Sequence, residues 1–271
     1  RSALWAANLR LIGFAVDVVP GGWKRYRQWV RESLATLPQR FDYRVVCGPT
    51  NCGKTRLLQA LDDQGEQVLD LEGLARHRGS LLGALPGHKQ PSQKRFESDL
   101  TSALMHFDPT RPVFVEAESS RIGVISVPRR LLDSIHRGAC IEVEASIEDR
   151  ITFLLQDYSH LFDEPEHFKQ LLARLTGLHS KQAIQHWHQL IDSDARAQLF
   201  GELVERHYDP AYARSSHAHF QEISHALPFV FRPNGIDGLQ QARLLLQQIT
   251  AAHIGNAPCA SADAASGKLT P

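Results

Sequence analysis

The sequence has few cysteines, one methionine, no net charge and no long apolar run. Its four cysteines, Cys47, Cys52, Cys140 and Cys259, form no C-x-x-C pair, which excludes a disulfide scaffold and favours a reducing compartment. No apolar run approaches the ~20 residues that a membrane helix needs, and the first residues lack the order of a signal peptide. We therefore expect a cytoplasmic protein with no membrane segment. Lys+Arg and Asp+Glu both number 30, which excludes a histone-like nucleic-acid binder.

The length and the local distribution of charge are more informative. With 271 residues, of which 42% are apolar, the chain can form one large or two modest domains, and disorder is excluded as its main state. Residues 1–40 hold seven basic and two acidic side chains, whereas residues 144–170 hold seven acidic and two basic ones. The chain begins at Arg1 and its only methionine is Met105. We therefore expect an N-terminally truncated fragment.

Strand and helix patterns alternate over most of the chain. Short apolar runs predict strands at 43–47, 67–71, 112–117, 140–145 and 227–231. Helical spacing predicts helices at 55–61, 93–107, 128–137, 147–158 and 238–249. This alternation predicts an α/β fold with a parallel sheet and helices on both of its faces.

Three regions depart from that alternation. The N-terminal region predicts a helix at 2–14 that ends near Ile12, a strand at 15–19 and a basic amphipathic helix at 23–37. From about 160 to 226 the strand signals vanish, which predicts a helical insert. The tail at 251–271 is small and polar, and we expect it to be disordered.

A glycine-rich motif follows the first predicted sheet strand. GPTNCGKT at 48–55 fits G-x-x-x-x-G-K-[ST], and its place between a strand and a helix indicates a phosphate-binding loop (P-loop). The candidate phosphate-binding residues are Gly48, Thr50, Asn51, Cys52, Gly53, Lys54 and Thr55. Lys54 supplies a point charge and Thr55 a hydroxyl for Mg²⁺. The motif leaves open ATP, GTP, a polyphosphorylated substrate or a prenyl diphosphate. It also leaves Cys52 as either a reactive thiol or, by preference, a small residue filling the loop.

Acidic side chains lie at the ends of two predicted strands. Asp70 and Glu72 are two residues apart, so they share one face and are candidates to hold Mg²⁺ or a catalytic water. The ordinary alternative is a helix N-cap with solvated charges. Glu116 ends the third sheet strand at the position of a Walker-B acid, and Glu118 follows as a further carboxylate for a metal or a base. Parallel strands place such residues at the carboxyl edge of the sheet.

Three arginines accompany these carboxylates. Arg76 and Arg78 are candidates to bind the phosphates of a ligand or of RNA, although a solvated basic turn is the common alternative. Arg121, in the order E-x-E-S-x-R, is a candidate anion-binding residue beside the P-loop.

The histidines give a weaker signal. Of 14 histidines, nine lie between 160 and 225, some in H-x-H pairs. Residues two apart on a helix do not face each other, so packing is favoured over metal binding. The cluster HYDPAY at 207–212 suits either base stacking or core packing.

Several longer strings together resemble one family. DLEGLARHRGS at 70–80, EAESSRIG at 116–123 and YDPAY at 208–212, all downstream of GPTNCGKT, closely resemble the tRNA 2-selenouridine synthases. This family consists of a rhodanese domain followed by a P-loop domain. The pattern V-P-G-G-W-K at 19–24 resembles the end of the rhodanese domain.

The resemblance covers roughly residues 1–250 and implies a domain organisation. Residues 1–38 are a C-terminal rhodanese remnant with a linker helix, and residues 39–250 are a P-loop NTPase-like domain with the helical insert. In the family, the catalytic rhodanese cysteine precedes the Arg-Ser pair that here is Arg1-Ser2. None of the four cysteines of this chain therefore takes that role.

The resemblance also implies an activity. The family is a transferase that replaces sulfur by selenium at the wobble 2-thiouridine of tRNA, using selenophosphate, through an S-geranyl intermediate made from geranyl diphosphate. Lys54, with Mg²⁺, assists departure of the diphosphate, and Arg76, Arg78 and Arg121 share that task. Lys54, Glu116 and Asp70 are the candidate catalytic residues. An enzyme that supplies selenophosphate is an implied partner.

The basic helix at 23–37 is a candidate RNA contact. Its interleaved aromatic and basic residues suit the phosphate backbone of tRNA. The candidate tRNA-binding residues are Lys24, Arg25, Arg27 and Arg31. An exposed linker helix is the plain alternative. For the whole chain, the rival functions are a small-molecule or nucleoside kinase and a nucleotide-gated RNA-binding module.

Overall fold

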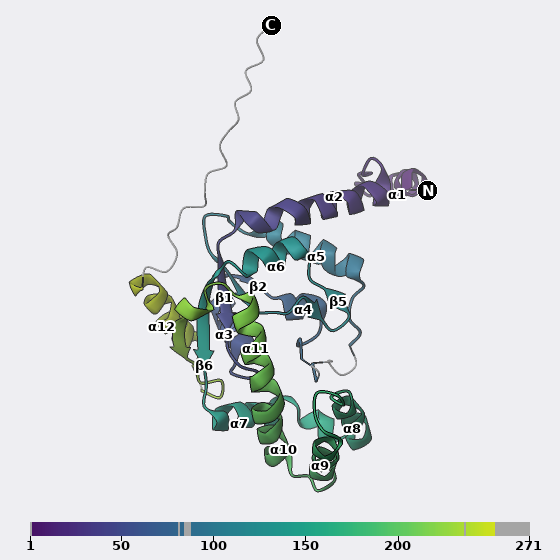
Figure 1. The fold of residues 1–271 in the computed structure, drawn as a ribbon. Coiled ribbons are helices and arrows are strands. Elements are labelled where there is room, and N and C mark those ends of the chain that lie inside the picture. The colour runs from purple at the N-terminus through teal and green to yellow at the C-terminus, as the bar shows by residue number, and fades with distance from the viewer. Residues whose placement is uncertain (1, 81, 84–87, 236, 253–271) are drawn as a thin grey trace.

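The computed structural model describes residues 2–80, 82–83, 88–235 and 237–252. Almost all of the tail at 251–271, which we expected to be disordered, lies outside these residues. Within the described part of the chain, no helix is both long and apolar enough to cross a membrane. Figure 1 shows a central sheet with flanking helices, a helical unit at one end and two N-terminal helices at the other.

Five parallel strands form the central sheet. They are β1 (Tyr43–Cys47), β2 (Gln67–Leu69), β3 (Val113–Glu116), β6 (Ala139–Glu144) and β7 (Leu227–Val230). Their order is β2-β3-β1-β6-β7, and every residue of the central strand β1 is buried, as expected for a parallel strand covered on both faces. Val45 of β1 pairs with Val115 of β3 and Cys140 of β6. The five predicted sheet strands are confirmed.

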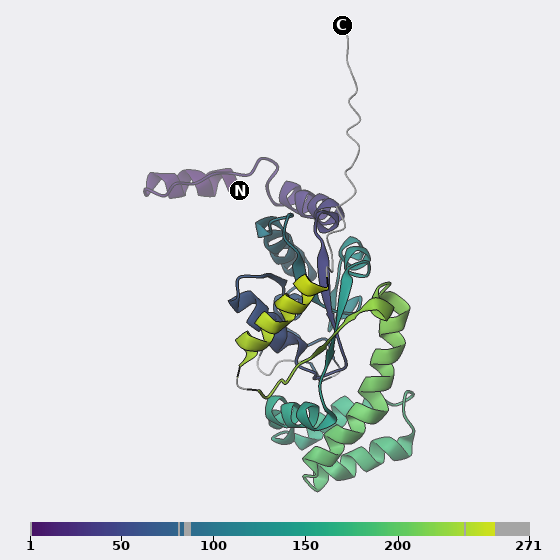
Figure 2. The same cartoon turned by 90° about the vertical axis from the view of Figure 1, so that its left-hand side faces the viewer.

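Helices cover both faces of the sheet, as predicted. One face packs against α2 (Gly22–Thr36), α4 (Leu71–Ala75), α5 (Gln93–His106) and α6 (Arg129–Ile135), and the other against α3 (Lys54–Asp63) and α12 (Gly238–Ala251). Successive residues of β1 point to opposite faces. Val45 packs in the core that contains Phe96 of α5, whereas Val46 packs in the core that contains Leu57 of α3. Figure 2 shows α12 (yellow) lying across its face of the sheet.

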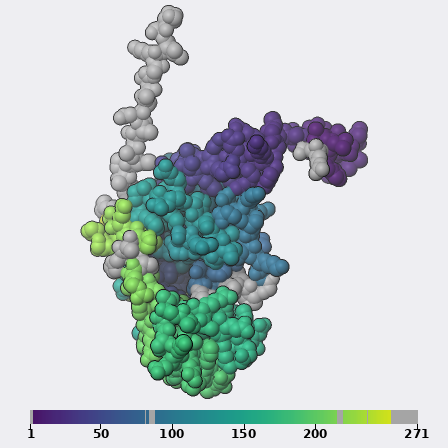
Figure 3. Space-filling view, turned by 45° about the vertical axis from the view of Figure 1, so that its right-hand side comes forward, coloured from purple at the N-terminus to yellow at the C-terminus, as the bar shows by residue number. Residues whose placement is uncertain are grey.

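The helical unit has a hydrophobic core of its own. Its elements are α7 (Ile147–Asp157), the 3-10 helix η2 (Ser159–Phe162), α8 (Pro165–Ala173), α9 (Lys181–Asp192), α10 (Arg196–Leu203), the π-helical turn η3 (Val204–Tyr208) and α11 (Asp209–His219). Phe168, Trp187 and Phe200 form the centre of this core, which also contains Leu154 of α7. The unit therefore begins before residue 160, where we expected the insert to start. Figure 3 shows it (green) packed below the sheet part of the molecule (blue and teal).

The N-terminal region contains α1 (Ser2–Leu11) and α2, but the strand predicted at 15–19 is wrong. Within the described residues no strand pairs with this segment, and it is irregular. The Arg10 side chain donates to the carbonyl of Val16 at 3.0 Å. A strand needs a neighbour for its backbone hydrogen bonds, and an alternating apolar pattern cannot supply one. The 3-10 helix η1 (Leu37–Arg40) then leads into β1.

A small antiparallel hairpin was not predicted. It consists of β4 (Arg121–Ile122) and β5 (Ile125–Ser126). Two glutamine side chains hold it: Gln90, which precedes α5, donates to the carbonyl of Ile122 at 2.9 Å, and Gln93, the first residue of α5, donates to that of Ser126 at 2.8 Å. Strands of two residues are too short to show a period in the sequence.

Candidate functional site

The P-loop is shaped by glycines that tolerate close packing. Gly48 has φ +143°, and a Cβ there would lie 2.5 Å from the carbonyl oxygen of Val143. Gly53 has φ +91°, and a Cβ there would lie 2.7 Å from the ring of Phe231. Any other residue would push the loop off β6 or off the segment after β7. The loop therefore turns tightly from β1 into the N-terminus of α3, where backbone N–H groups favour an anion.

Lys54 and Thr55 open α3 and lie beside the acid that ends β3. The Lys54 ammonium nitrogen lies 3.0 Å from the carbonyl oxygen of Gly48 and 3.5 Å from a carboxylate oxygen of Glu116. The Thr55 hydroxyl donates to the other oxygen of Glu116 at 3.0 Å. Because β1 and β3 are neighbours in register, the strand pairing itself brings Glu116 to the P-loop. The predicted association of these three residues is present in the structure.

Three carboxylates meet at this edge of the sheet. One oxygen from each of Glu72, Glu116 and Glu118 lies within 4.8 Å of the others, the only such group that the described residues contain. Burial and, next, the neighbouring Glu116 raise the pKa of Glu72 and of Glu118 above the ordinary value of 4.5. With the Thr55 hydroxyl, which lies 3.5 Å from Glu72, they offer the hard oxygen donors that Mg²⁺ prefers. These residues fit a divalent cation.

A cavity of about 710 Å³ lies between the P-loop and the helical unit. The sheet side of the cavity contributes the P-loop, Glu72, His77, Arg78, Glu116 and Glu118. The helical side contributes Phe153, Asp157, Tyr158, His207, Tyr208, Ala211 and Tyr212. One wall is therefore charged and the other is mostly aromatic. Its volume is within the range of small-molecule sites, about 300–1,000 Å³.

Asp70 has a structural role in addition to its place on the rim. Its carboxylate accepts a hydrogen bond from the backbone N–H of Gly73 at 2.8 Å, so it is the N-cap of α4. The helix cap that the sequence offered as the ordinary alternative is therefore present, while Asp70 also lines the cavity and its catalytic role stays a prediction. Glu72, two residues later, is the member of the pair that turns into the carboxylate cluster.

The three candidate arginines have separate positions. Arg78 lines the cavity, forms an ion pair with Asp157 at 2.7 Å and lies over the ring of Tyr158. Arg76 is exposed at the left-handed C-cap of α4, and Arg121 is exposed in the β4–β5 hairpin. Neither of these two lines the cavity. The expectation that all three share one anion site is therefore wrong for Arg76 and Arg121, because local turns carry them away.

Cys52 faces the core and not the ligand space. Its side chain is fully buried among Leu57, Phe114 and Phe231, and burial raises the pKa of its thiol. The structure supports the interpretation of Cys52 as a small residue that fills the space under the loop. Of Cys52, only the backbone therefore stays a candidate for phosphate binding.

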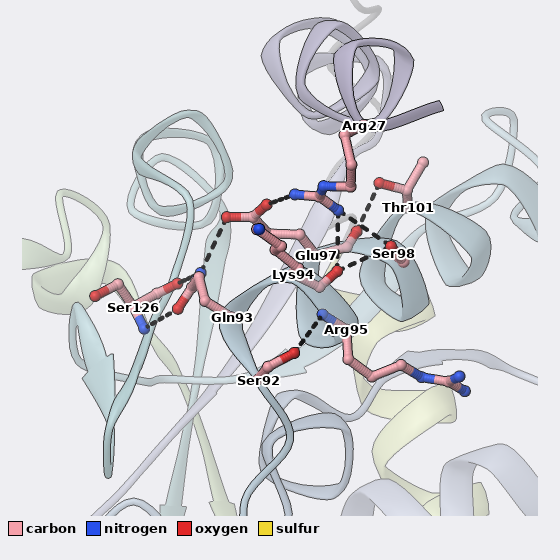
Figure 4. A network of polar contacts seen from close by, with 9 residues as sticks. All are labelled: Arg27, Ser92, Gln93, Lys94, Arg95, Glu97, Ser98, Thr101 and Ser126. Carbon is pink, nitrogen blue, oxygen red and sulfur yellow. Dashed lines mark hydrogen bonds and ion pairs between the residues drawn. The ribbon is translucent and has the colours of Figure 1, made fainter. Parts of the chain in front are cut away.

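The basic helix α2 presents only some of its cations to solvent. Lys24, Arg25 and Arg31 are exposed, but Arg27 is buried against α5. The Arg27 guanidinium forms an ion pair with Glu97 and donates to the carbonyl of Lys94 at 2.9 Å, as Figure 4 shows. We therefore remove Arg27 from the expected tRNA contacts, because its partners already occupy its donors.

Sequence reasoning missed part of the aromatic wall. Phe153 and Asp157 lie in the second half of α7 and Tyr158 is its C-cap, and nothing in the local pattern separates them from ordinary helix residues. For Tyr208 and Tyr212 of the HYDPAY string, the sequence leaves base stacking and core packing open. Both line the cavity, and Tyr208 also packs in the helical core. His77, one of three successive basic residues, is not predicted as a site residue, yet it lines the cavity as well.

Comparison with known proteins agrees with this architecture. The family model of the tRNA 2-selenouridine synthase AAA domain matches residues 41–180, about half of the chain. Proteins named tRNA 2-selenouridine synthase are similar over longer stretches. One from Alcanivorax borkumensis is 33% identical over 240 residues, covering 78% of this chain and 65% of the relative. One from Hydrogenovibrio crunogenus is 32% identical over 228 residues, covering 74% and 61%.

A third relative, from Chromohalobacter salexigens, is 36% identical over 158 residues, covering 58% of this chain and 42% of its own length. The chain thus spans less than two thirds of the length of the curated relatives it matches. The stretch matched by the family model includes the P-loop and the three clustered carboxylates.

Proposed function

The chain belongs to the tRNA 2-selenouridine synthase family, and from this premise we propose that its cavity binds a prenyl diphosphate for the modification of tRNA. The reaction replaces the sulfur of wobble 2-thiouridine by selenium, with geranyl diphosphate and selenophosphate as co-substrates. This chain carries the alkylation half of that reaction. The observation that supports the proposal is that a phosphate-binding loop and an aromatic wall line one cavity.

Alkylation comes first in the proposed sequence. The sulfur attacks C1 of the geranyl group, so a C–S bond forms, the C–O bond to the diphosphate breaks, and the base loses its N3 proton. The neutral thiocarbonyl is a poor leaving group, whereas the S-alkylated base has an electrophilic C2. Selenium then attacks C2, geranyl thiol leaves, and hydrolysis of the Se–P bond releases phosphate. The alkylation makes the later exchange chemically accessible.

The charged wall suits the leaving group of the first step. Lys54 and the backbone N–H groups at the start of α3 stabilise the charge that develops on the departing diphosphate. Glu72, Glu116, Glu118 and the Thr55 hydroxyl would hold Mg²⁺, which when bound neutralises phosphate charge. Arg78, held by Asp157, adds a fixed cation at the same wall.

The aromatic wall suits the prenyl chain. Tyr208 and Tyr212 bring aromatic rings into the lining of the cavity, as do Phe153 and Tyr158, whose rings also lie under the guanidinium groups of Arg56 and Arg78. Ring faces also stabilise positive charge, which builds up on an allylic carbon as its diphosphate departs. An apolar chain with a diphosphate head therefore matches both walls, whereas inorganic phosphate would leave the aromatic wall without a ligand.

The tRNA is proposed to lie along the exposed cations of α2. Lys24, Arg25 and Arg31 are available to phosphates, and the rings of Trp23, Tyr26 and Trp29 lie in series on the same helix, with centroids 5.3 and 5.8 Å apart. An enzyme that makes selenophosphate is the expected supplier for the second step.

The test is alkylation of the wobble nucleoside. We would incubate the chain with tRNA containing wobble 2-thiouridine, Mg²⁺ and geranyl diphosphate, digest the RNA and measure the nucleoside by mass spectrometry. Lys54→Ala should lose the product, whereas Lys181→Ala, which changes an exposed lysine at the start of α9, should keep it. Turnover of ATP without a geranylated nucleoside would favour a kinase. Bound tRNA with no change under any condition would favour an RNA-binding module.

A further inference from the structure

A buried arginine connects the P-loop to the helical unit. Arg150 lies on α7, and its side chain is only 4% exposed. Its Nε donates to the carbonyl of Thr50 in the P-loop at 3.0 Å. Its two terminal nitrogens donate to the two carboxylate oxygens of Asp209 at 3.0 and 2.5 Å. One guanidinium therefore joins three segments that are far apart in the sequence.

Arginine suits this position and lysine does not. The planar guanidinium presents parallel N–H groups that match a carboxylate, while its Nε remains free for a third acceptor. A lysine has one charged nitrogen and cannot make both the fork to Asp209 and the bond to Thr50 from the same place. A buried charge also needs all its partners, because each unpaired donor carries a desolvation cost.

The bond to Thr50 fixes the orientation of a peptide unit in the P-loop. The peptide between Thr50 and Asn51 is trans, so its C=O and N–H groups point in opposite directions. Because Arg150 holds the Thr50 carbonyl, the Asn51 N–H points away from Arg150. Asn51 itself has φ +64°, in the left-handed region, which asparagine adopts more readily than most non-glycine residues. Arg150 thus fixes the orientation of a peptide unit in a loop whose residues Thr50 and Asn51 both line the cavity.

The bond to Asp209 fixes the aromatic wall. The π-helical turn η3 ends just before Asp209, whose backbone N–H donates to the carbonyl of Val204, five residues earlier. One extra residue in a turn rotates the side chains that follow by about 100°. Asp209 consequently faces Arg150 while Tyr208 and Tyr212 line the cavity. π-Helical turns are rare and often occur at functional sites.

We propose that Arg150 and Asp209 form a latch that sets the P-loop peptide and the aromatic wall in register, so that diphosphate affinity depends on it. Both are positioning residues. The inference rests on the proposed function for the identity of the ligand, but the loop geometry that it predicts exists without a ligand.

The experiment has a ligand-free and a ligand-bound arm. In the first, amide hydrogen exchange is measured over residues 48–55 in the wild type, in Asp209→Asn and in Asp133→Asn. The last variant changes the exposed Arg129–Asp133 pair on α6, which is remote from the cavity. Exchange should be faster, by about tenfold, only in Asp209→Asn. Equal exchange in the wild type and Asp209→Asn overturns the latch, whatever the ligand is.

In the second arm, calorimetry measures binding of inorganic pyrophosphate with Mg²⁺. Asp209→Asn and Arg150→Lys should each weaken binding about tenfold, and the double variant should be no weaker than either, since both remove one unit. Asp133→Asn should bind as the wild type does. Loss in Lys54→Ala with wild-type affinity in both latch variants overturns the latch and leaves the proposed function intact.

Two further outcomes keep the proposals apart. Unchanged binding in Lys54→Ala contradicts the proposed function, and the exchange arm then decides the latch alone. If Arg150→Lys fails to fold, Asp209→Asn remains, because the Asp209 side chain is 36% exposed and its replacement nearly isosteric. Circular dichroism verifies the fold of each variant.

Discussion

The two walls of the cavity are held in place by different means. On the sheet wall, the P-loop follows β1 and Glu116 ends the neighbouring strand β3, in fixed register with it, and β1 is buried on both faces. The helical wall has its own core, into which Leu82 of the sheet part also packs, and it meets the sheet wall through polar contacts, among them Arg150 with Thr50 and Arg78 with Asp157. In such a site, the charged groups of the sheet wall have fixed positions, whereas the position of the helical wall depends on a small number of contacts.

The largest expected effect comes from the core of the helical unit and should leave the cores on the two faces of the sheet nearly unchanged. Trp187→Ala removes the largest fully buried side chain, at the centre of the helical core, and should lower the free energy of unfolding by about 3–5 kcal/mol. Because the sheet has separate cores, hydrogen exchange should accelerate in α8–α10 and much less in β1 and β6. Urea unfolding followed by circular dichroism gives the energy, and exchange mass spectrometry gives the location. Equal acceleration in both regions would contradict the comparison.

The second prediction concerns pH and the carboxylates of the sheet wall. Glu72 and Glu118 have pKa values raised above 4.5, so they keep protons at pH values where ordinary carboxyls have lost them. A divalent cation must displace these protons, and its affinity should therefore rise with pH, about tenfold per unit for each proton displaced. Titration with Mn²⁺ from pH 6 to 8 measures this slope.

The matched variants sharpen that prediction. Glu118→Gln should flatten the slope and weaken Mn²⁺ binding, while Glu144→Gln, an exposed glutamate at the end of β6, should leave both unchanged. The stability of the ligand-free protein should change with pH in the opposite direction to cation affinity. A carboxyl whose pKa is raised in the folded state lowers the free energy of unfolding as pH rises above the pKa that it has in the unfolded chain. Without ligand, Glu118→Gln should therefore be more stable than the wild type at pH 8. A slope of zero in the wild type would contradict the assigned cation site.

The smallest effects distinguish the structural cation of α2 from the exposed ones. Arg27→Gln leaves Glu97 without its buried partner and should reduce stability by about 1–3 kcal/mol, with no change in the salt dependence of tRNA binding. Lys24→Gln should leave stability unchanged and reduce the slope of log affinity against log salt by about 0.7–0.9. Thermal unfolding and filter binding over a salt series measure the two. A loss of stability in Lys24→Gln together with a reduced salt dependence in Arg27→Gln would contradict these two assignments.

Much of the sheet wall was predictable from sequence because its signals are local. Apolar runs marked all five strands, and the motif at 48–55 named the residues of the P-loop. Parallel pairing then required Glu116 to lie near Lys54 and Thr55, as it does. The family resemblance also places the phosphate site at the P-loop.

The rest depends on contacts between distant residues, which a single sequence does not reveal. Arg150 and Asp209 are 59 positions apart, and neither stands in a recognisable motif with the other. The sequence pattern does not distinguish Arg27 from its basic neighbours, whereas the structure buries its side chain against α5. Asp70 and Arg121 carried plausible chemistry, but a helix cap and a short hairpin decided their positions. These outcomes reflect tertiary packing, which overrides local pattern.

The most direct test of the account is the affinity of one protein for three ligands with Mg²⁺: geranyl diphosphate, inorganic pyrophosphate and ATP. If the charged wall holds the diphosphate and the aromatic wall the chain, geranyl diphosphate should bind at least about 100-fold more tightly than pyrophosphate, since burial contributes ~0.8 kcal/mol per CH₂. Tyr212→Ala should reduce that advantage and leave pyrophosphate affinity unchanged. Equal affinity for geranyl diphosphate and pyrophosphate, or tightest binding of ATP, would contradict the account.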